Sequence, residues 1–351
     1  MIPIQNIYYM LSYSFQPLRE KGYKKVATEH FDNATELCAA ILIRGVSLQL
    51  KQGLGRDYIP ETETLSEIKG KINFTESIKT QALLRKQMVC TYDDFSVNTY
   101  MNQIIKTTLQ KLLLADINKA QKKAIKKLLV FFSDVQELDV YSINWNLNFV
   151  HNNQTYEMLV SICYLLLKGL LQTQSNGNTK LMDFTVEQKH RLYERFILGY
   201  YKTEHPELTA KASQVPWQVD DGFTSMLPIM QTDISLEHNG TVLIIDAKYY
   251  EHTTQVQYDK HTIHSHNLYQ IFTYVKNKEY ELRDTDHKVS GMLLYAKTDE
   301  EILPNNIYQM SGNQITVKTL DLNLPLTDIS TQLDEIARSH FSPKEYAYGL
   351  K

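Results

Sequence analysis

The residues whose types could do chemistry gather in one short stretch of the chain, residues 228–250. Its two apolar-rich runs flank Asn239-Gly240, and an Asn-Gly pair between such runs is a strong signal for a β-hairpin. Pairing the two strands about that turn places Asp233 directly opposite Asp246, with the Cβ atoms of the pair about 5 Å apart. Because two like charges so placed repel, the hairpin predicts a compensating cation beside them.

One cation stands close by in the sequence. Lys248 follows Asp246 by two positions, so it lies on the same face of the strand because side chains alternate between faces. Ala247, between them, points to the other face and toward the core. Two facing carboxylates with an ammonium group on one surface suit a metal ion, a water molecule and a substrate.

Length and composition bound the class of protein. A chain of 351 residues with this apolar content favours two globular domains. With a net charge of −3, contact with nucleic acid would need local basic patches or a partner's positive field. The cysteines, Cys38, Cys90 and Cys163, form no CxxC pair, which predicts a reducing compartment without disulfides or a zinc site. The first residues do not resemble a signal peptide and no apolar run is long enough for a bilayer. We therefore expect a cytoplasmic protein that does not enter a membrane.

The chain divides at a polar, glycine-containing segment, residues 172–180, which has little to bury and is the best domain boundary. We therefore expect one domain at 1–175 and a second at 176–351. In the first, helical spacing of apolar residues alternates with a β-rich segment at 47–95. This predicts an α+β module with helices over 4–15, 33–46, 99–132 and 156–171.

The second domain is expected to be an α/β domain with a mixed central sheet flanked by helices. The order of its first elements, read from periodicity and turn residues, is α-β-β-β-α-β. These elements are a helix over 186–203, strands near 211–219, 227–237 and 241–249, a helix over 266–278 and a strand over 291–296. A polar loop is expected before 265, and a strand over 315–322 and a helix from about 327 complete the domain.

The spacing of Asp233 and Asp246-Ala247-Lys248 on this pattern of elements resembles the PD-(D/E)xK nuclease superfamily. The resemblance implies that Asp233, Asp246 and the backbone carbonyl of Ala247 bind Mg²⁺, which prefers oxygen ligands. Such an ion lowers the pKa of a bound water and offsets charge on the scissile phosphate. Lys248 would help to position the water and add electrostatic stabilisation.

Three further residues gain a role from this resemblance. Gln270 and Tyr274 are four positions apart, in QIFTY, and therefore share one helix face. They resemble the QxxxY element of RecB-like nucleases, which implies that Gln270 braces the metal site and that Tyr274 lies near the DNA. Glu194, in YERF, stands where many relatives carry an acidic residue near the metal. A solvated helix charge explains Glu194 equally well.

Longer stretches resemble the McrC family, the nuclease subunits of McrBC modification-dependent restriction systems. They are IPIQNIYYMLSY near the start, IKGKINFTESI at 68–78, FSVNTYMNQIIKTTL at 95–109, LIIDAKYY in the hairpin and HSHNLYQIFTYV at 264–275. In one departure, Lys71 follows Gly70 where the family pattern has arginine, so a contact that needs a bidentate guanidinium is in doubt there.

The McrC resemblance implies partners as well as a reaction. Proteins of this family assemble with McrB, a hexameric AAA+ GTPase whose own domain reads modified cytosine in DNA. The McrC N-terminal region, for which residues 47–95 are the best candidate here, stimulates GTP hydrolysis, and McrC cuts the DNA. This chain has no G-x-x-x-x-G-K-[ST] motif, so GTP is expected on the partner rather than here. Cutting both strands needs two active sites or two events, which makes a McrC–McrC dimer a reasonable expectation.

Two other functions stay open at this point. The chain could act chiefly as a regulatory adaptor of the AAA+ motor, with a weak or silent nuclease centre. It could also be a stand-alone RecB-like DNA nuclease without a GTPase partner. Loss of cleavage on substitution of Asp246 or Lys248, with GTPase stimulation kept, would favour the nuclease subunit over the adaptor.

Two clusters of titratable residues have simpler explanations than a binding site. The lysines between 119 and 127 are better explained as a solvated helix face than as phosphate contacts. His252, His261, His264 and His266 follow the hairpin, and a zinc site would need a tighter pattern. We interpret these histidines as part of a loop near the DNA.

Overall fold

The computed structural model describes residues 2–149, 153–175, 184–250, 254–257, 260–297 and 303–341. It divides into two compact units, which we call the sheet unit (Met1–Ala34 with Phe184–Lys351) and the arm unit (Thr35–Asp183). The first 34 residues therefore belong with the C-terminal part of the chain, which corrects the expected division at 175. The expected boundary segment falls partly on residues 176–183, which lie outside the described residues.

Helices make up most of the arm unit, and their positions largely match the expected ones. They are α3 (Ala34–Gln52), α5 (Tyr100–Leu114), α6 (Lys119–Leu129) and α7 (Gln154–Ser175). The side chain of Thr99 caps α5 by accepting a hydrogen bond from the backbone N–H of Asn102. Residues 47–50, expected in a strand, lie instead within α3, because a short apolar run is ambiguous between the two periods.

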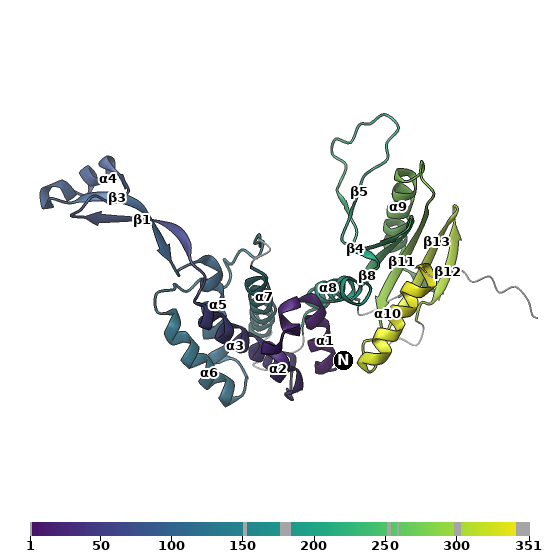
Figure 1. The fold of residues 1–351 in the computed structure, drawn as a ribbon, viewed down its shortest axis with the longest axis horizontal. Coiled ribbons are helices and arrows are strands. Elements are labelled where there is room, and N and C mark those ends of the chain that lie inside the picture. Colours follow the sequence, from purple (N-terminus) through teal and green to yellow (C-terminus); the bar gives the residue numbers. More distant parts are fainter. Residues whose placement is uncertain are drawn as a thin grey trace, which may run out of the picture. The chain divides into compact units, whose positions relative to one another are not determined.

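A β-arm extends from these helices and ends in short helices (Figure 1). Its sheet is antiparallel, in the order β1-β3-β2, and α4 (Phe74–Lys79) lies at its far end. Gly70 has a φ of +67°, and a Cβ there would lie 2.4 Å from the carbonyl oxygen of Thr91, so only glycine fits this turn. The strands are β1 (Asp57–Leu65), β2 (Lys71–Ile72) and β3 (Met88–Ser96).

The sheet unit is built on a six-stranded sheet in the order β12-β13-β11-β8-β7-β4. β11 runs parallel to both β8 and β13, and the other pairs are antiparallel. The expected mixed central sheet is therefore present. Its strands are β4 (Thr209–Lys211), β7 (Ile234–His238), β8 (Thr241–Lys248), β11 (Lys288–Ala296), β12 (Asn306–Met310) and β13 (Asn313–Leu320).

The β7–β8 hairpin has the predicted turn and register. Asn239 and Gly240 have φ values of 45° and 75°, as a turn with two left-handed residues requires. The paired ladder ends at Ile234 opposite Ile245, one pair short of the two aspartates. Before Asp233, the backbone N–H of Thr232 donates a hydrogen bond to the carbonyl of Ser213, next to a separate small ladder of 214–215 with 230–231.

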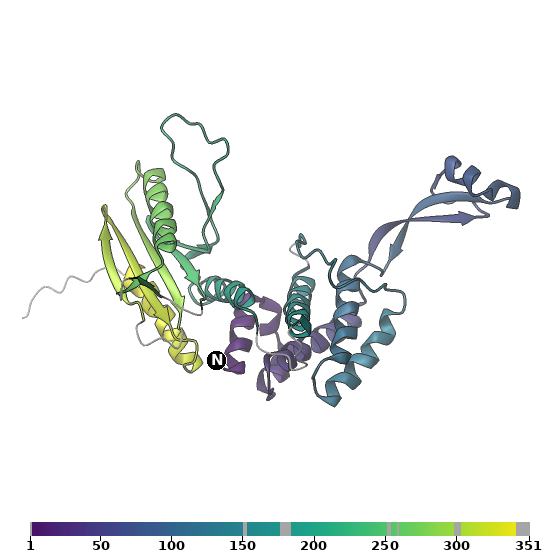
Figure 2. The same ribbon diagram turned by 180° about the vertical axis from the view of Figure 1, so that it is seen from behind.

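Helices cover both faces of this sheet (Figures 1 and 2). Ile271 and Val275 of α9 pack with Val242 and Ile244 of β8, which places Asp246 and Lys248 on the α9 side because side chains alternate. α8 begins with a capping box formed by Thr185 and Gln188. The helices of the sheet unit are α1 (Ile4–Ser14), α2 (Lys24–Thr28), α8 (Val186–Glu204), α9 (Ser265–Glu281) and α10 (Leu326–Phe341), of which α8, α9 and α10 contact the sheet.

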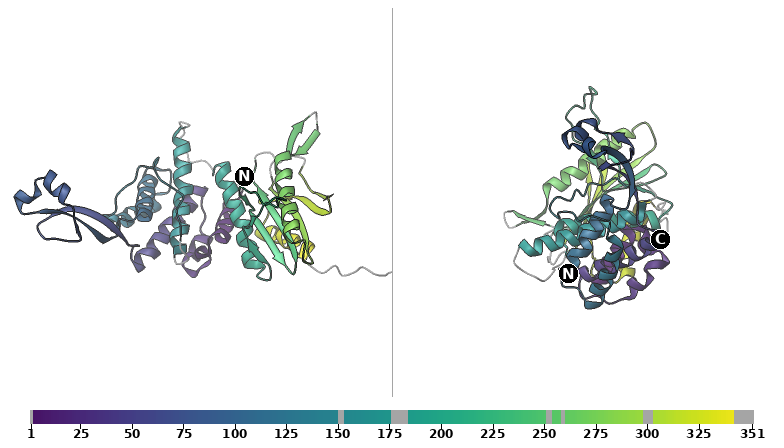
Figure 3. Two further views of the ribbon diagram at one scale, coloured as in Figure 1. Left: turned by 90° about the horizontal axis from the view of Figure 1, so that it is seen from above. Right: turned by 90° about the vertical axis from the view of Figure 1, so that its left-hand side faces the viewer.

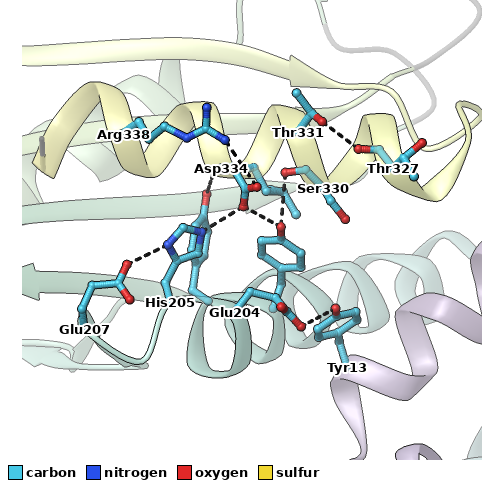
Figure 4. A network of polar contacts seen from close by, with 12 residues as sticks. Tyr13, Glu204, His205, Glu207, Thr327, Ser330, Thr331, Asp334 and Arg338 are labelled. Carbon is cyan, nitrogen blue, oxygen red and sulfur yellow. Dashed lines mark hydrogen bonds and ion pairs between the residues drawn. The ribbon is translucent and has the colours of Figure 1, made fainter.

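A polar network joins α8 to α10 (Figure 4). Oδ1 of Asp334 accepts a hydrogen bond from the hydroxyl of Tyr200 at 2.7 Å. The same oxygen lies 3.0 Å from Nε2 of His205. Nδ1 of His205 lies 2.9 Å from Oε1 of Glu207. These contacts fix the end of α8 that is followed by the edge strand β4.

Helix α1 explains why the first residues group with the sheet unit. A Cβ on Gly199 of α8 would lie 2.0 Å from the carbonyl oxygen of Tyr13, so the two helices approach as closely as a glycine permits. The amide of Asn6 donates to the carbonyls of Leu322 and Leu324 at 2.6 and 3.0 Å. None of these partners is near α1 in sequence, so periodicity alone could not assign α1 to this unit.

Two other expectations need correction. The first expected strand, 211–219, is replaced by β4 and β5 (Gln214–Val215), and residues 216–229 form a long loop before β6 (Met230–Gln231) (Figures 1 and 2). The expected loop before residue 265 contains a small hairpin, β9 (Thr254–Gln257) with β10 (Lys260–Ile263), that stands apart from the large sheet (Figure 3). Within the described ranges, no helix is both long and apolar enough to cross a membrane.

Candidate active site

The two aspartates expected to face each other are brought together. Asp233 lies one residue before β7, and Asp246 lies in β8. The backbone N–H of Ala247 donates a hydrogen bond of 2.9 Å to Oδ2 of Asp233. The two carboxyl groups are close enough to act on each other's pKa. Asp233 is therefore tied to β8 by the hydrogen bond between its carboxylate and the backbone of Ala247, and not by backbone pairing between β7 and β8.

Asp246 and Lys248 form a buried ion pair. Asp246 is 1% exposed and Lys248 is 7% exposed, and Oδ2 of Asp246 lies 2.9 Å from Nζ of Lys248. Oδ1 of Asp246 is buried and has no hydrogen-bond partner among the described residues. A carboxylate oxygen in that state is costly to bury, so Oδ1 is well suited to bind a cation.

The pKa values show an excess of negative charge at this site. Burial, with Asp246 and Glu194 nearby, raises the pKa of Asp233 to about 7. Burial also raises the pKa of Asp246, although the ammonium group of Lys248 acts against it. For Lys248, burial lowers the pKa, but the attraction of the two aspartates outweighs burial and the pKa ends above its ordinary value. Lys248 alone does not balance the carboxylates, and a divalent cation would.

Gln270 and Tyr274 extend the site along α9. Nζ of Lys248 donates to Oε1 of Gln270 at 3.4 Å, and Nε2 of Gln270 donates to the hydroxyl of Tyr274 at 2.9 Å. That hydroxyl in turn donates to the backbone carbonyl of Gln231 at 3.1 Å. Tyr274 is only 7% exposed, so in this structure its side chain braces Gln270.

Glu194 lies at the edge of the same site. Oε1 of Glu194 is 2.7 Å from Nδ1 of His190, one turn earlier on α8. The charge of Glu194 raises the pKa values of both Asp233 and Asp246. Glu194 is therefore close enough to act on the aspartates electrostatically, while its side chain keeps partial contact with solvent.

The donor set fits Mg²⁺, which commonly binds through one or two carboxylates and keeps several waters. Asp233 and Asp246 supply those carboxylates, and the carbonyl of Ala247 stays a predicted third ligand. In the part of the chain that the structure describes, no group of three or more His, Cys, Asp or Glu side chains could hold an ion. The pair of aspartates therefore suits a hydrated ion better than a fully protein-bound one.

The two histidines after the hairpin whose side chains are described, His264 and His266, are not part of any group of three or more side chains that could hold a metal ion. The rings of His264 and His266 lie 5.7 Å apart, and His264 packs against Tyr250. His252 lies outside the described residues, and only the backbone of His261 is described.

We expect the metal-free chain to lose stability as the pH rises from about 4 to about 7. A carboxyl group with a raised folded pKa keeps its proton after the unfolded chain has released its own. Stability therefore falls between the unfolded pKa, about 3.9, and the folded pKa of Asp233, about 7. Urea unfolding in EDTA should show a loss of roughly 1 to 4 kcal/mol in wild type relative to Asp233→Asn.

The comparison with Asp233→Asn is necessary because other groups change stability in the opposite sense. Asp321 and Glu279 have lowered pKa values despite partial burial, because Lys297 and Lys276 lie beside them. Their contributions are present in both proteins and cancel in the difference. If wild type and variant lost stability equally over this range, the raised pKa of Asp233 would be wrong.

Sequence reasoning missed three residues that the structure places around Lys248. Asn267 is fully buried in α9; it accepts a hydrogen bond from Tyr250 at 3.2 Å and donates one to Tyr295 at 2.9 Å. Tyr295 lies opposite Lys248 in the parallel β8–β11 register. The one signal in the sequence was the spacing of Asn267 and Gln270, three apart on the same helix face.

Comparison with known proteins gives a consistent result. A family model described as McrBC 5-methylcytosine restriction system component matches residues 5–296. The chain is 27% identical over 343 residues to the type IV methyl-directed restriction enzyme EcoKMcrBC of Escherichia coli (strain K12), covering 96% of this chain and 97% of that protein.

Among solved structures, two from Thermococcus gammatolerans are similar to this chain. One is a refined half-complex from a tetradecameric assembly of McrB AAA+ hexamers with bound McrC, with a TM-score of 0.49 and 13% identity over 96% of this chain and 76% of that one. The other is a cryo-EM structure of the McrBC complex, with a TM-score of 0.41 and 14% identity over 57% and 58% of the two chains. Because the family match at 5–296 spans most of its length, this chain belongs to the family of McrBC 5-methylcytosine restriction system components, as its sequence blocks predict.

Proposed function

We propose that this chain is the DNA-cutting subunit of a modification-dependent restriction complex. Its reaction is the Mg²⁺-dependent hydrolysis of phosphodiester bonds in DNA that carries modified cytosine. The observation that carries the proposal is the buried carboxylate pair, in which Oδ1 of Asp246 has no hydrogen-bond partner among the described residues and Lys248 lies beside Oδ2. Burying this excess negative charge lowers the stability of the fold. A nuclease site explains why the two aspartates are nevertheless present, because they would bind the cation that the reaction requires.

Each residue of the site has a role in this proposal. Asp233 and Asp246 would hold the ion, which when bound stabilises charge on phosphoryl oxygens and lowers the pKa of water. Lys248 supplies a fixed positive charge to a scissile phosphate, since the aspartates keep it protonated. Gln270 holds the ammonium group of Lys248 in place, and Glu194 adds negative field at the edge of the site.

The arm unit supports the second half of the proposal, the stimulation of a partner McrB-like AAA+ GTPase hexamer that binds GTP itself. At the far end of the β-arm, apolar side chains are exposed to solvent instead of packing in a core. Exposed apolar patches of this kind mark protein interfaces. The side chains are Ile68 (66% exposed), Phe74 (60%), Ile78 (66%) and Leu84 (80%). A purely regulatory adaptor would also carry this patch. The adaptor and the nuclease subunit therefore differ only in whether the sheet unit cuts DNA.

The functions are separated by replacing Lys248 with methionine in the reconstituted complex of this chain, the GTPase, GTP and methylated DNA. Cleavage should fall at least a hundredfold because the charge beside the reacting phosphate is lost, while GTP hydrolysis is still stimulated. Lys211→Met is the matched control, because Lys211 also pairs with a carboxylate of the sheet unit, Glu237, but on the edge strand. Full cleavage by Lys248→Met would show that the site is assigned wrongly, and cleavage without any GTPase would favour a stand-alone nuclease.

A further inference from the structure

Helix α9 turns a stripe of buried and partly buried polar side chains toward the sheet. Asn267, Gln270 and Tyr274 follow one another at intervals of three and four, so they line one side of the helix. Ile271 and Val275 fill the apolar contact beside them. Burying amide and phenol groups in such a contact costs stability unless each is hydrogen-bonded, and each of the three is.

One residue of the stripe, Asn267, is hydrogen-bonded both to the segment that follows β8 and to β11. Oδ1 of Asn267 accepts a hydrogen bond from the hydroxyl of Tyr250 at 3.2 Å, and its Nδ2 donates to the hydroxyl of Tyr295 at 2.9 Å. Tyr250 follows Lys248 by two residues, and Tyr295 is the register partner of Lys248 on β11. Asn267 is 0% exposed; its bond with Tyr295 is buried, and its bond with Tyr250 is partly buried.

Lys248 needs this kind of support. A lysine side chain is a flexible four-carbon stem, and its contact with Gln270, at 3.4 Å, is at the long end for a hydrogen bond. Both tyrosines lie next to Lys248 along the backbone: Tyr250 is two residues further on, and Tyr295 is the register partner of Lys248 on β11. The surroundings of Lys248 therefore include two phenol groups whose positions depend on their hydrogen bonds with Asn267.

We propose that Asn267 is a positioning residue of the nuclease site, which holds the hydroxyl groups of Tyr250, just after β8, and of Tyr295, in β11, and thereby fixes where Lys248 can lie. The inference rests on the proposed nuclease function. Asn267 touches neither the aspartates nor the substrate in this account, and it acts only through the two tyrosines and Lys248.

The test uses the full chain in the reconstituted complex and compares three variants that remove these bonds without removing bulk. Asn267→Leu removes both bonds, Tyr250→Phe removes one and Tyr295→Phe removes the other. With a methylated duplex and Mg²⁺, kcat for cleavage should fall at least tenfold in Asn267→Leu and severalfold in each phenylalanine variant. The KM for DNA and the stimulation of GTP hydrolysis should stay at the wild-type values.

Tyr201→Phe is the matched control, because its buried hydroxyl donates to the carbonyl of Leu333 in the same unit. It should lose stability like the other variants and still cleave at the wild-type rate. If Asn267→Leu does not fold, Tyr250→Phe carries the test, since Tyr250 is only half-buried.

The outcomes separate this inference from the proposed function. If Lys248→Met cleaves as wild type does, the nuclease assignment itself is wrong. If Lys248→Met is inactive while the Asn267 and tyrosine variants cleave within twofold of wild type, only the positioning role is overturned. Equal loss of cleavage in Tyr201→Phe would likewise overturn it, because the effect would then follow stability rather than Lys248.

Discussion

Replacing Asp246 with asparagine should stabilise the metal-free chain at pH 7.5, because burial raises the pKa of Asp246 and so makes its charged form unfavourable in the folded state. Asp246 is almost fully buried, and together with Asp233 and Glu194 it exceeds the charge of Lys248. Asparagine keeps the shape and leaves Lys248 with the charge of Asp233 beside it. The variant should unfold at higher urea concentration than wild type in EDTA.

The same variant should lose its response to Mg²⁺. Ligand binding to the folded state alone raises the free energy of unfolding, so wild type should gain stability as Mg²⁺ is added, and Asp246→Asn should gain little. Asp321→Asn is the matched control: Asp321 pairs with Lys297 at 2.7 Å and has a lowered pKa. That substitution should destabilise the chain and leave the Mg²⁺ response intact. A destabilised Asp246→Asn, or one that still responds to Mg²⁺, would show that the aspartates form an ordinary ion pair with Lys248.

Replacing the apolar residues at the end of the β-arm should abolish stimulation of the partner GTPase. Phe74→Ser, Ile78→Ser and Leu84→Ser together remove exposed apolar surface that would be buried in an interface. GTP hydrolysis by the partner should fall at least tenfold toward its unstimulated rate, measured at saturating concentration of this chain. Stability should change little, because exposed side chains seldom contribute more than about 0.5 kcal/mol each.

A second triple variant controls for the general loss of apolar surface. Leu114, Val130 and Phe131 are equally exposed, at 81%, 73% and 62%, but belong to the helical part of the arm unit. Serine at these three positions should leave GTPase stimulation unchanged. If this variant loses stimulation and the arm variant keeps it, the partner binds the helices and not the arm.

The hairpin could be predicted from the sequence because its determinants are local. The two-residue turn requires two residues in the left-handed conformation, which Asn239 and Gly240 adopt readily. The turn then fixes which residues of the two strands lie opposite each other. The register then brought Asp233 toward Asp246 without knowledge of the rest of the fold. The pairing of Gln270 with Tyr274 could also be predicted from the sequence, because helical spacing alone puts the two residues on one face.

What the sequence could not supply depends on contacts between distant segments. The pairing of Tyr295 with Lys248 needs the parallel register of β8 and β11, which a crossover helix separates. Without that register, Asn267 looks like any polar residue in the first turn of a helix. The placement of α1 in the sheet unit likewise depends on Gly199, whose missing side chain matters only once the partner helix is known.

The most direct test of the central claim is cleavage of a methylated duplex by the reconstituted complex as Mg²⁺ is varied, with wild type and Asp246→Asn compared in parallel. Wild type should cleave the duplex faster as Mg²⁺ rises and should stop in EDTA. Asp246→Asn should lose at least a thousandfold in cleavage rate, even though that variant is the more stable protein and still stimulates GTP hydrolysis. Cleavage by Asp246→Asn at the wild-type rate would contradict the account and place the cutting centre elsewhere.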